Sequence, residues 1–244
     1  MNIELMRKVD YFAGIPLCFL ATLLVRIAEL LAGQKGGAPT NVLFLELSEM
    51  GSAILVDPAM RKMRRVANAE LYFLIFRSNA ASLRLLGTVP ESNVFTIRED
   101  NFVNLTLDSL RFLFWARRRR IDTVIDLELF SRYSALLTGL SGAARRIGFH
   151  AFNDEGLYRG NMLTHRVAYN PHLHIAKNFI ALVNAVLAGK AELPFSKTRI
   201  EDSEISLARA QVDQGAIGMM RGRIRNAFPR YDETRHRIVL INPN

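Results

Sequence analysis

The chain has 244 residues, of which 50% are hydrophobic and 23% are charged; this composition suits one or two globular units and excludes a disordered tail. Its formal net charge of +9 favours anionic partners, namely a membrane surface, a phosphorylated substrate or nucleic acid, without choosing among them. The single cysteine, Cys18, excludes an internal disulfide and a cysteine-cluster metal site, and it favours a reducing, cytosolic location.

Residues 1–34 form an apolar segment that differs in composition from the rest of the chain. The apolar stretch at residues 11–25 is shorter than the ~20 residues that a membrane-spanning helix needs, and Gly14 and Pro16 interrupt it. We therefore expect a helix that lies in the membrane interface, with flanking basic residues against anionic head groups. The alternative is a helix packed on the protein's own core. Residues 33–41 then predict a flexible linker.

From residue 41 onward, apolar runs of strand length alternate with helical patterns. The expected strands are residues 41–47, 71–76, 94–97, 123–129 and 145–149, and the expected helices lie within 52–66, 79–86, 102–118 and 131–140. Pro58 either follows an N-cap at Asp57 or kinks a helix that begins at Ser52. Buried strands alternating with helices indicate an α/β fold, a Rossmann-like parallel sheet with right-handed crossovers.

After residue 150 the pattern becomes less regular. Residues 165–169 are a possible strand, residues 171–189 predict a helix with Pro171 at its start, and a second helical region spans about 203–228. Residues 235–244 have the pattern of a first strand, followed by a small polar turn. We therefore expect three parts. They are an interface helix and linker (1–40), a Rossmann-like domain with trailing helices (41–235) and the start of a truncated second domain (236–244).

Four segments, taken in order, resemble one protein family. They are residues 41–63, 124–150, 172–186 and 238–244. Together they look like the amino-terminal half of glycosyltransferase family 9, the heptosyltransferases of lipopolysaccharide synthesis. The resemblance covers about residues 41–244. It implies one half of a GT-B architecture, in which two Rossmann-like domains face a cleft, the first holding a lipid-linked acceptor and the second most of a sugar-nucleotide donor.

The resemblance also implies an activity and its partners. Family 9 enzymes are inverting transferases, so we expect a heptose or related sugar to pass from an ADP-heptose-like donor to lipopolysaccharide core or another glycolipid. No cofactor is implied, and the protein is expected to be cytoplasmic and peripheral on the inner membrane. The chain alone is expected to be inactive, because the donor domain is missing from it.

The glycine after the first expected strand carries the catalytic hypothesis. Ligands of parallel sheets bind beyond the carboxyl ends of the strands, and Gly51 would let the backbone approach a ligand closely. The family usually has an aspartate directly after this glycine, but here the position holds Ser52. A serine hydroxyl is not ionised near neutral pH, so we expect Glu49 to be the displaced base. Alternatively, Ser52 only caps the following helix, and the chain is a non-catalytic, membrane-associated glycolipid-binding domain.

Further site residues follow from the resemblance. The expected acceptor-binding residues are Gly51, Arg132, Ser134, Arg146 and His150. Arginine forks match the carboxylates and phosphates of a lipopolysaccharide inner core, and Arg132 is the strongest candidate. Asn242 and Asn244 are expected to contact the donor.

Two features carry less weight. The basic run at residues 116–120 ends a helix, where it complements the helix dipole and can also touch lipid head groups. No aromatic or base-reading partners accompany it, so nucleic acid is not expected as a partner. His172 and His174 would lie on different faces of a helix, so no metal site is expected.

Overall fold

The computed structural model describes residues 3–32, 37–129, 131–150, 158–188, 199–208 and 213–239, with side chains omitted for residues 3–10 and 32. The chain forms two compact units, Met1–Arg209 and Ala210–Asn244. The first unit contains the sheet and the candidate site. Within the described part of the second unit lies one α-helix, α8 (Gln214–Ala227). The expected donor-binding residues Asn242 and Asn244 lie outside the described residues.

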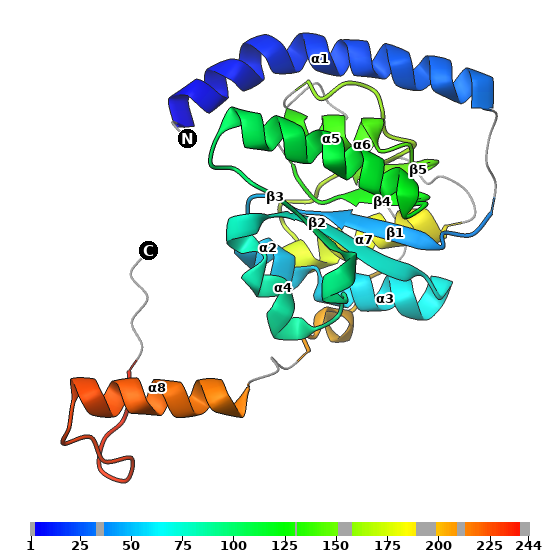
Figure 1. The fold of residues 1–244 in the computed structure, drawn as a ribbon. Helices are drawn as coiled ribbons and strands as arrows, with labels where there is room; N and C mark the ends of the chain where they lie inside the picture. Colours follow the sequence, from blue (N-terminus) through cyan, green and yellow to red (C-terminus); the bar gives the residue numbers. More distant parts are fainter. Residues whose placement is uncertain are drawn as a thin grey trace. The chain divides into compact units, whose positions relative to one another are not determined.

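A six-stranded parallel sheet organises the first unit (Figure 1). Its strands are β1 (Asn41–Leu45), β2 (Glu70–Phe76), β3 (Val94–Ile97), β4 (Thr123–Asp126), β5 (Arg145–Phe149) and β6 (His165–Val167). They pair in the order β3-β2-β1-β4-β5-β6, and every pair is parallel. The Rossmann-like α/β fold expected from the sequence is confirmed.

Helices cover both faces of this sheet. They are α2 (Met50–Leu55), α3 (Asp57–Ala67), α4 (Ala81–Leu86), α5 (Phe102–Arg118), α6 (Arg132–Leu140) and α7 (Ile175–Leu187). Short 3₁₀ turns lie at η1 (Arg77–Asn79), η2 (Glu91–Asn93) and η3 (Asp202–Ile205). Figure 1 shows α5 and α6 on one face of the sheet and α2, α3 and α4 on the other.

Strand β1 contributes side chains to two hydrophobic cores, one on each face of the sheet. Because successive side chains of a strand point to opposite faces, Val42 and Phe44 belong to the core beneath α3 and α7. Leu43 and Leu45 belong to the core beneath α5 and α6. All four side chains are fully buried. The continuous apolar run at the start of β1 is therefore explained by burial on both faces, as parallel sheets require.

The strand order also locates a topological switch point. The chain leaves β1 toward β2 on one side, whereas β4 lies on the other side of β1. At such a switch point the loops that follow the two central strands diverge, and ligands of open α/β sheets bind there. The segments directly after β1 and β4 are therefore the place to look for a site.

Several local expectations were wrong in detail. Helix α2 ends at Leu55 and α3 begins at Asp57, so Pro58 is the second residue of a new helix whose N-cap is Val56. Helix α7 begins at Ile175 rather than Pro171, because the His174 ring accepts a hydrogen bond from the Ala176 amide at 3.2 Å and caps the helix there.

The carboxyl-terminal pattern also differs from expectation. The single region expected at about 203–228 is a 3₁₀ turn, η3, and the separate helix α8. Residues 236–239 have no strand structure, and residues 240–244 lie outside the described residues.

The amino-terminal segment is one continuous helix, α1 (Ile3–Ala32), with Pro16 inside it. The expected interruption at Gly14 and Pro16 is therefore wrong, and residues 11–31 are long and apolar enough to cross a membrane by length and composition. One face of α1 nevertheless packs on α6, where Cys18, Ala21 and Val25 are buried with Ala135 and Met162.

The docking of α1 depends on close backbone approach at Gly160. This residue has a positive φ of 76°, and a Cβ atom there would lie 2.6 Å from Thr22 Oγ1 and 2.9 Å from the Cys18 carbonyl oxygen. Thr22 Oγ1 in turn accepts a hydrogen bond from the Asn161 amide at 2.9 Å. Farther along α1, Glu29 forms an ion pair with the buried Arg146.

These contacts predict a stability difference between two glycines. Gly160→Ala should lower the free energy of unfolding by about 1–3 kcal/mol, because the residue is left-handed and its Cβ would collide with backbone. Gly51→Ala is the matched control, since its Cβ would have no described atom within 4 Å and alanine favours a helix by up to ~1 kcal/mol. Urea unfolding of both variants measures the difference, and equal stabilities would contradict the described packing of α1.

Candidate functional site

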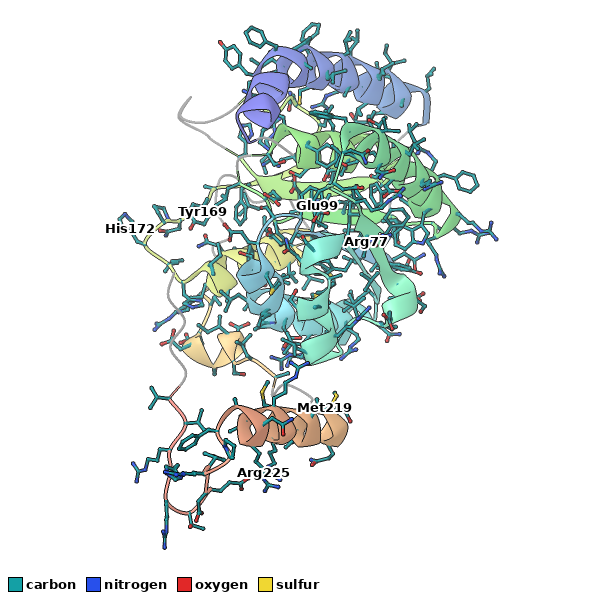
Figure 2. All side chains as sticks on the ribbon, turned by 60° about the vertical axis from the view of Figure 1, so that its left-hand side comes forward. Arg77, Glu99, Tyr169, His172, Met219 and Arg225 are labelled. Atoms are coloured by element: carbon teal, nitrogen blue, oxygen red, sulfur yellow. The ribbon has the colours of Figure 1, made fainter. Side chains whose placement is uncertain are left out.

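Polar side chains follow the strands at the carboxyl edge of the sheet. Figure 2 labels three of them, namely Arg77 after β2, Glu99 after β3 and Tyr169 after β6. At the centre of this edge, the segments after β1 and β4 supply three glutamates: Glu46, Glu49 and Glu128. The described residues include no group of three side chains suited to hold a metal ion. The three glutamates make carboxyl groups the main chemical feature at the centre of this edge.

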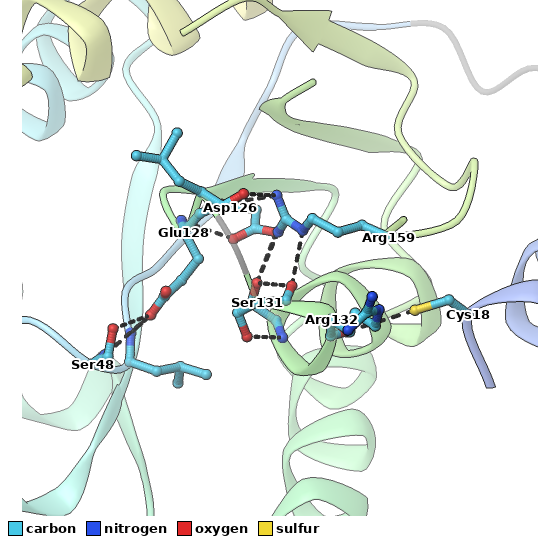
Figure 3. Close-up of polar contacts among 10 residues, drawn as sticks. Cys18, Ser48, Asp126, Glu128, Ser131, Arg132 and Arg159 are labelled. Atoms are coloured by element: carbon cyan, nitrogen blue, oxygen red, sulfur yellow. Dashed lines mark hydrogen bonds and ion pairs between the residues drawn. The ribbon is translucent and has the colours of Figure 1, made fainter. Parts of the chain in front are cut away.

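Glu128 joins the ends of the two central strands. Its Oε1 accepts hydrogen bonds from the Leu47 amide at 3.0 Å, the Ser48 amide at 3.1 Å and the Ser48 hydroxyl at 2.9 Å (Figure 3). The Asn79 side chain holds the same loop from η1, donating to the carbonyls of Leu47 at 2.9 Å and Ser48 at 3.1 Å. The loop between β1 and α2 is therefore fixed from two neighbouring strands.

Glu46 is the buried member of this group, with 3% of its surface exposed. Burial, and then the charge of Glu128, raises the pKa of Glu46 from 4.5 to about 9. Its Oε1 also accepts a hydrogen bond from the Glu49 amide at 3.2 Å. At neutral pH Glu46 is therefore a neutral, hydrogen-bonded acid that contributes to holding the loop.

The exposed Glu49 forms a pair with the buried Ser52 at the start of α2. The Ser52 hydroxyl donates to Glu49 Oε2 at 2.7 Å, and the Glu49 side chain is exposed. The alternative in which Ser52 caps the helix is wrong, because the N-cap position is Glu49 and Ser52 lies inside α2. Gly51 also lies in the first turn of α2 rather than in a glycine turn, and a Cβ atom built on it would have no described atom within 4 Å.

A second polar cluster lies at the end of β4 and centres on Arg159 (Figure 3). Arg159 forms an ion pair with the buried Asp126, and it donates to the carbonyls of Glu128 and Ser131, both at 2.9 Å. Ser134 joins the cluster by donating to Asp126 Oδ2 at 3.1 Å. Burial raises the pKa of Asp126 to about 6, although the Arg159 charge opposes this shift. Arg159 thereby ties the segment that starts at residue 158 to the sheet edge.

Of the other predicted binding residues, Arg132 and Arg146 are buried in this scaffold and His150 is partly buried. Arg132 is 4% exposed, and its Nε donates to the Tyr158 carbonyl at 2.8 Å. Arg146 is 5% exposed, and its Nε donates to the Met162 carbonyl at 2.7 Å. Burial lowers the pKa of His150, and nearby arginines add to the effect. These contacts anchor the 158–162 segment, and the expected contact of these residues with an acceptor stays a prediction.

Sequence reasoning missed Glu46 and Glu128. The signal was present, because the tripeptide Leu-Glu-Leu occurs at residues 45–47 and again at 127–129. Both copies leave the two central strands of the sheet. Since parallel strands end at the same edge, a repeated acid at these two positions predicts a carboxyl pair at the switch point.

Comparisons with known proteins show the fold of the chain. No family model and no curated protein matches it. Escherichia coli heptosyltransferase WaaC, solved with ADP-2-deoxy-2-fluoro heptose, is 14% identical with a TM-score of 0.52; the match covers 63% of this chain and 50% of that chain. The same enzyme solved with ADP is 15% identical with a TM-score of 0.51, over 63% of this chain and 49% of that one. A family 9 glycosyl transferase from Veillonella parvula DSM 2008 is 14% identical with a TM-score of 0.52, and the match covers 80% of this chain and 51% of that chain.

This chain therefore spans about half the length of each of these solved structures. At this level of identity the likeness concerns the fold. It agrees with the Rossmann-like fold of the described sheet.

The raised pKa of Glu46 predicts how stability depends on pH. An acid whose pKa is 4.5 when unfolded and about 9 when folded binds more protons in the folded state between these values. The contribution of Glu46 to stability should therefore be greatest below pH 4.5 and fall toward pH 9, by on the order of 1 kcal/mol per pH unit. Glu46→Gln keeps the neutral shape and should flatten this slope. Urea unfolding at pH 5, 6.5 and 8 measures it, and parallel curves for the two proteins would contradict the assignment.

Proposed function

We propose that the chain is the acceptor-binding half of an inverting glycosyltransferase that passes a heptose or related sugar from a nucleotide-sugar donor to lipopolysaccharide core or another glycolipid. The observation that carries the proposal is the Glu49–Ser52 pair at the switch point of the sheet. The fold likeness supports it, because two of the similar structures were solved with ADP or an ADP-sugar.

Glu49 is proposed as the base of the transfer. The acceptor hydroxyl oxygen forms a bond to the anomeric carbon of the donor, the bond to the nucleoside diphosphate breaks, and the hydroxyl proton passes to a base. The Glu49 side chain is exposed at the carboxyl edge of the sheet, so its carboxylate is accessible to an acceptor hydroxyl. The Ser52 hydroxyl donates to one carboxylate oxygen and leaves the other for the proton.

Glu46 and Glu128 are proposed to position this base rather than to take part in proton transfer. Glu46 accepts a hydrogen bond from the Glu49 amide, and Glu128 fixes the two residues that precede Glu49. Burial holds the proton on Glu46 at neutral pH, so it would be a poor base under the conditions in which Glu49 acts.

The membrane seat of the domain is proposed to be α1. Its outer face carries large apolar side chains that are at least 46% exposed, namely Phe12, Leu17, Phe19, Leu20, Leu23, Leu24, Ile27, Leu30 and Leu31. Its inner face is occupied from Cys18 to Glu29 by contacts with α6 and Arg146. A helix docked in this way would lose those contacts if it crossed a bilayer, so we propose that it lies in the plane of the interface. A lipid-linked acceptor would then reach the site from the surface to which α1 binds.

A second candidate function is a non-catalytic glycolipid-binding domain. It is favoured by Ser52, which occupies the position where the resembling family has an aspartate. The two functions share the fold and the membrane seat, and they differ only in whether Glu49 takes a proton. Substitution at this loop therefore separates them.

The catalytic proposal predicts the effect of three substitutions on transfer rate. With the chain joined to a nucleotide-sugar-binding domain, Glu49→Gln should lower the initial rate by ~10²-fold or more, because the amide keeps the shape but takes no proton. Ser52→Ala should leave most of the activity. Ser52→Asp restores the family's base and should retain or raise the rate.

The measurement is the initial transfer rate at saturating donor and acceptor, with acceptor affinity measured separately. An active parent protein with an unchanged rate after Glu49→Gln would refute the base assignment. An inactive parent protein that becomes active only after Ser52→Asp would favour the binding-domain function.

The membrane proposal predicts which apolar residues matter for vesicle binding. Leu20→Glu and Leu24→Glu together should release the protein from anionic vesicles, because each places a charge on the outer face of α1 while the docked face is kept. Leu85→Glu on α4 is the matched control, with a similarly exposed leucine on the opposite side of the sheet. Vesicle co-sedimentation measures the difference, and equal binding by both variants would argue against α1 as the seat.

A further inference from the structure

Helix α5 exposes a second apolar stripe. Val103, Leu107, Leu110 and Phe114 recur at spacings of four, three and four, which places them on one face of the helix. Their exposed fractions are 67%, 43%, 60% and 67%, respectively. The opposite face is already occupied, because Phe112 and Ala116 are fully buried against the sheet. The fold of the first unit therefore leaves the stripe unexplained.

The stripe runs into a cluster of cations. Phe114, Trp115, Arg118 and Arg119 together line a surface hollow, and the Arg119 guanidinium lies 6.0 Å from the centre of the Trp115 ring. The run at residues 117–120 is entirely arginine. The acidic side chain that α5 itself contributes, Asp108, is buried and paired with Arg98, so it does not offset these charges at the surface. Apolar and aromatic groups beside a cluster of positive charges are typical of surfaces that bind anionic lipid.

The stripe lies on the same side of the sheet as α1. Helices α5 and α6 share one face of the sheet, and α1 packs on the outer side of α6 (Figure 1). Packed helix axes lie roughly 8–10 Å apart, so α1 is one helix layer farther from the sheet than α5. The head-group layer of a bilayer is roughly 5–8 Å deep. An interfacial helix buries its apolar face roughly 5–10 Å into the boundary between head groups and acyl chains. With α1 immersed to that depth, the outer face of α5, one helix layer behind it, lies at the level of the head groups.

We propose that the outer stripe of α5 and the arginines at residues 117–120 bind the head-group layer of an anionic bilayer, as a second membrane contact beside α1. The proposal rests on the membrane seat proposed for α1. The proposal commits to a bilayer because the stripe continues into four consecutive arginines, whose positive charges complement anionic head groups.

A single-tryptophan experiment tests the contact directly. Trp115 is the one tryptophan of the chain, so Trp115→Phe removes the background signal. In the Trp115→Phe background, the test variant carries Phe114→Trp on the stripe. The control variant carries Val66→Trp on α3, at the other face of the sheet, where the Val66 side chain is 56% exposed. With phosphatidylglycerol vesicles that carry a head-group spin label, emission of Phe114→Trp should fall at least twofold and shift to the blue. Emission of Val66→Trp should change little.

Charge substitution provides the second readout. Leu110→Glu with Phe114→Glu should weaken vesicle affinity by on the order of tenfold, whereas Val66→Glu should leave it unchanged. Because both replaced side chains are largely exposed, the fold should tolerate them, and circular dichroism checks this.

The outcomes separate this proposal from the seat on α1. Loss of binding with α1 variants, combined with no quenching at Phe114→Trp and full binding by the α5 variant, would refute the second contact alone. A parent protein that does not bind vesicles at all would refute both. A dimer in the absence of vesicles that Leu110→Glu dissociates would show that a second copy of the chain covers the stripe, and this would also overturn the proposal.

Discussion

The site depends on one carboxylate that takes over hydrogen bonds which the sheet cannot supply. Where β1 ends, its chain turns toward α2 and away from β4, and the next backbone donors lose their ladder partners. Glu128 accepts from the amides of Leu47 and Ser48 and so extends the link between the two strands past the sheet. Asp122 does the same at the other end of β1, accepting from the amides of Thr40 at 2.9 Å and Asn41 at 2.8 Å.

The three glutamates have different places in this arrangement: Glu46 and Glu128 hold the loop, and Glu49 is exposed. Two carboxyl groups placed together under low exposure cannot both ionise at small cost, so the more buried one keeps its proton. Glu46 and Glu128 thereby support the loop that carries Glu49. Glu49 extends from this support toward solvent. A rigid support beneath an exposed carboxylate is what a base requires if it is to meet a hydroxyl in a fixed geometry.

Much of the fold could be predicted from local pattern, and most of the site geometry could not. The helix predicted over 102–118 has the same bounds in the structure, because Asn101 caps it through the Asn104 amide and its apolar periodicity is strong. The strands predicted at 94–97 and 145–149 also have these bounds in the structure. Arg146 was expected among the acceptor-binding residues because of the family resemblance. Its partner is Glu29, 117 residues away, and no local pattern reports a contact of that separation.

The seam between α1 and α6 contains the only thiol of the chain. Cys18 is fully buried there, so a reagent reaches its sulfur only when the helix lifts away from α6. If reclosing is faster than alkylation, the reaction rate is proportional to the population of the lifted state, as amide exchange rates are for local opening. The alkylation rate of Cys18 thus reports how often α1 is released from α6. Comparing this rate with and without a bilayer shows whether membrane binding changes the release of α1.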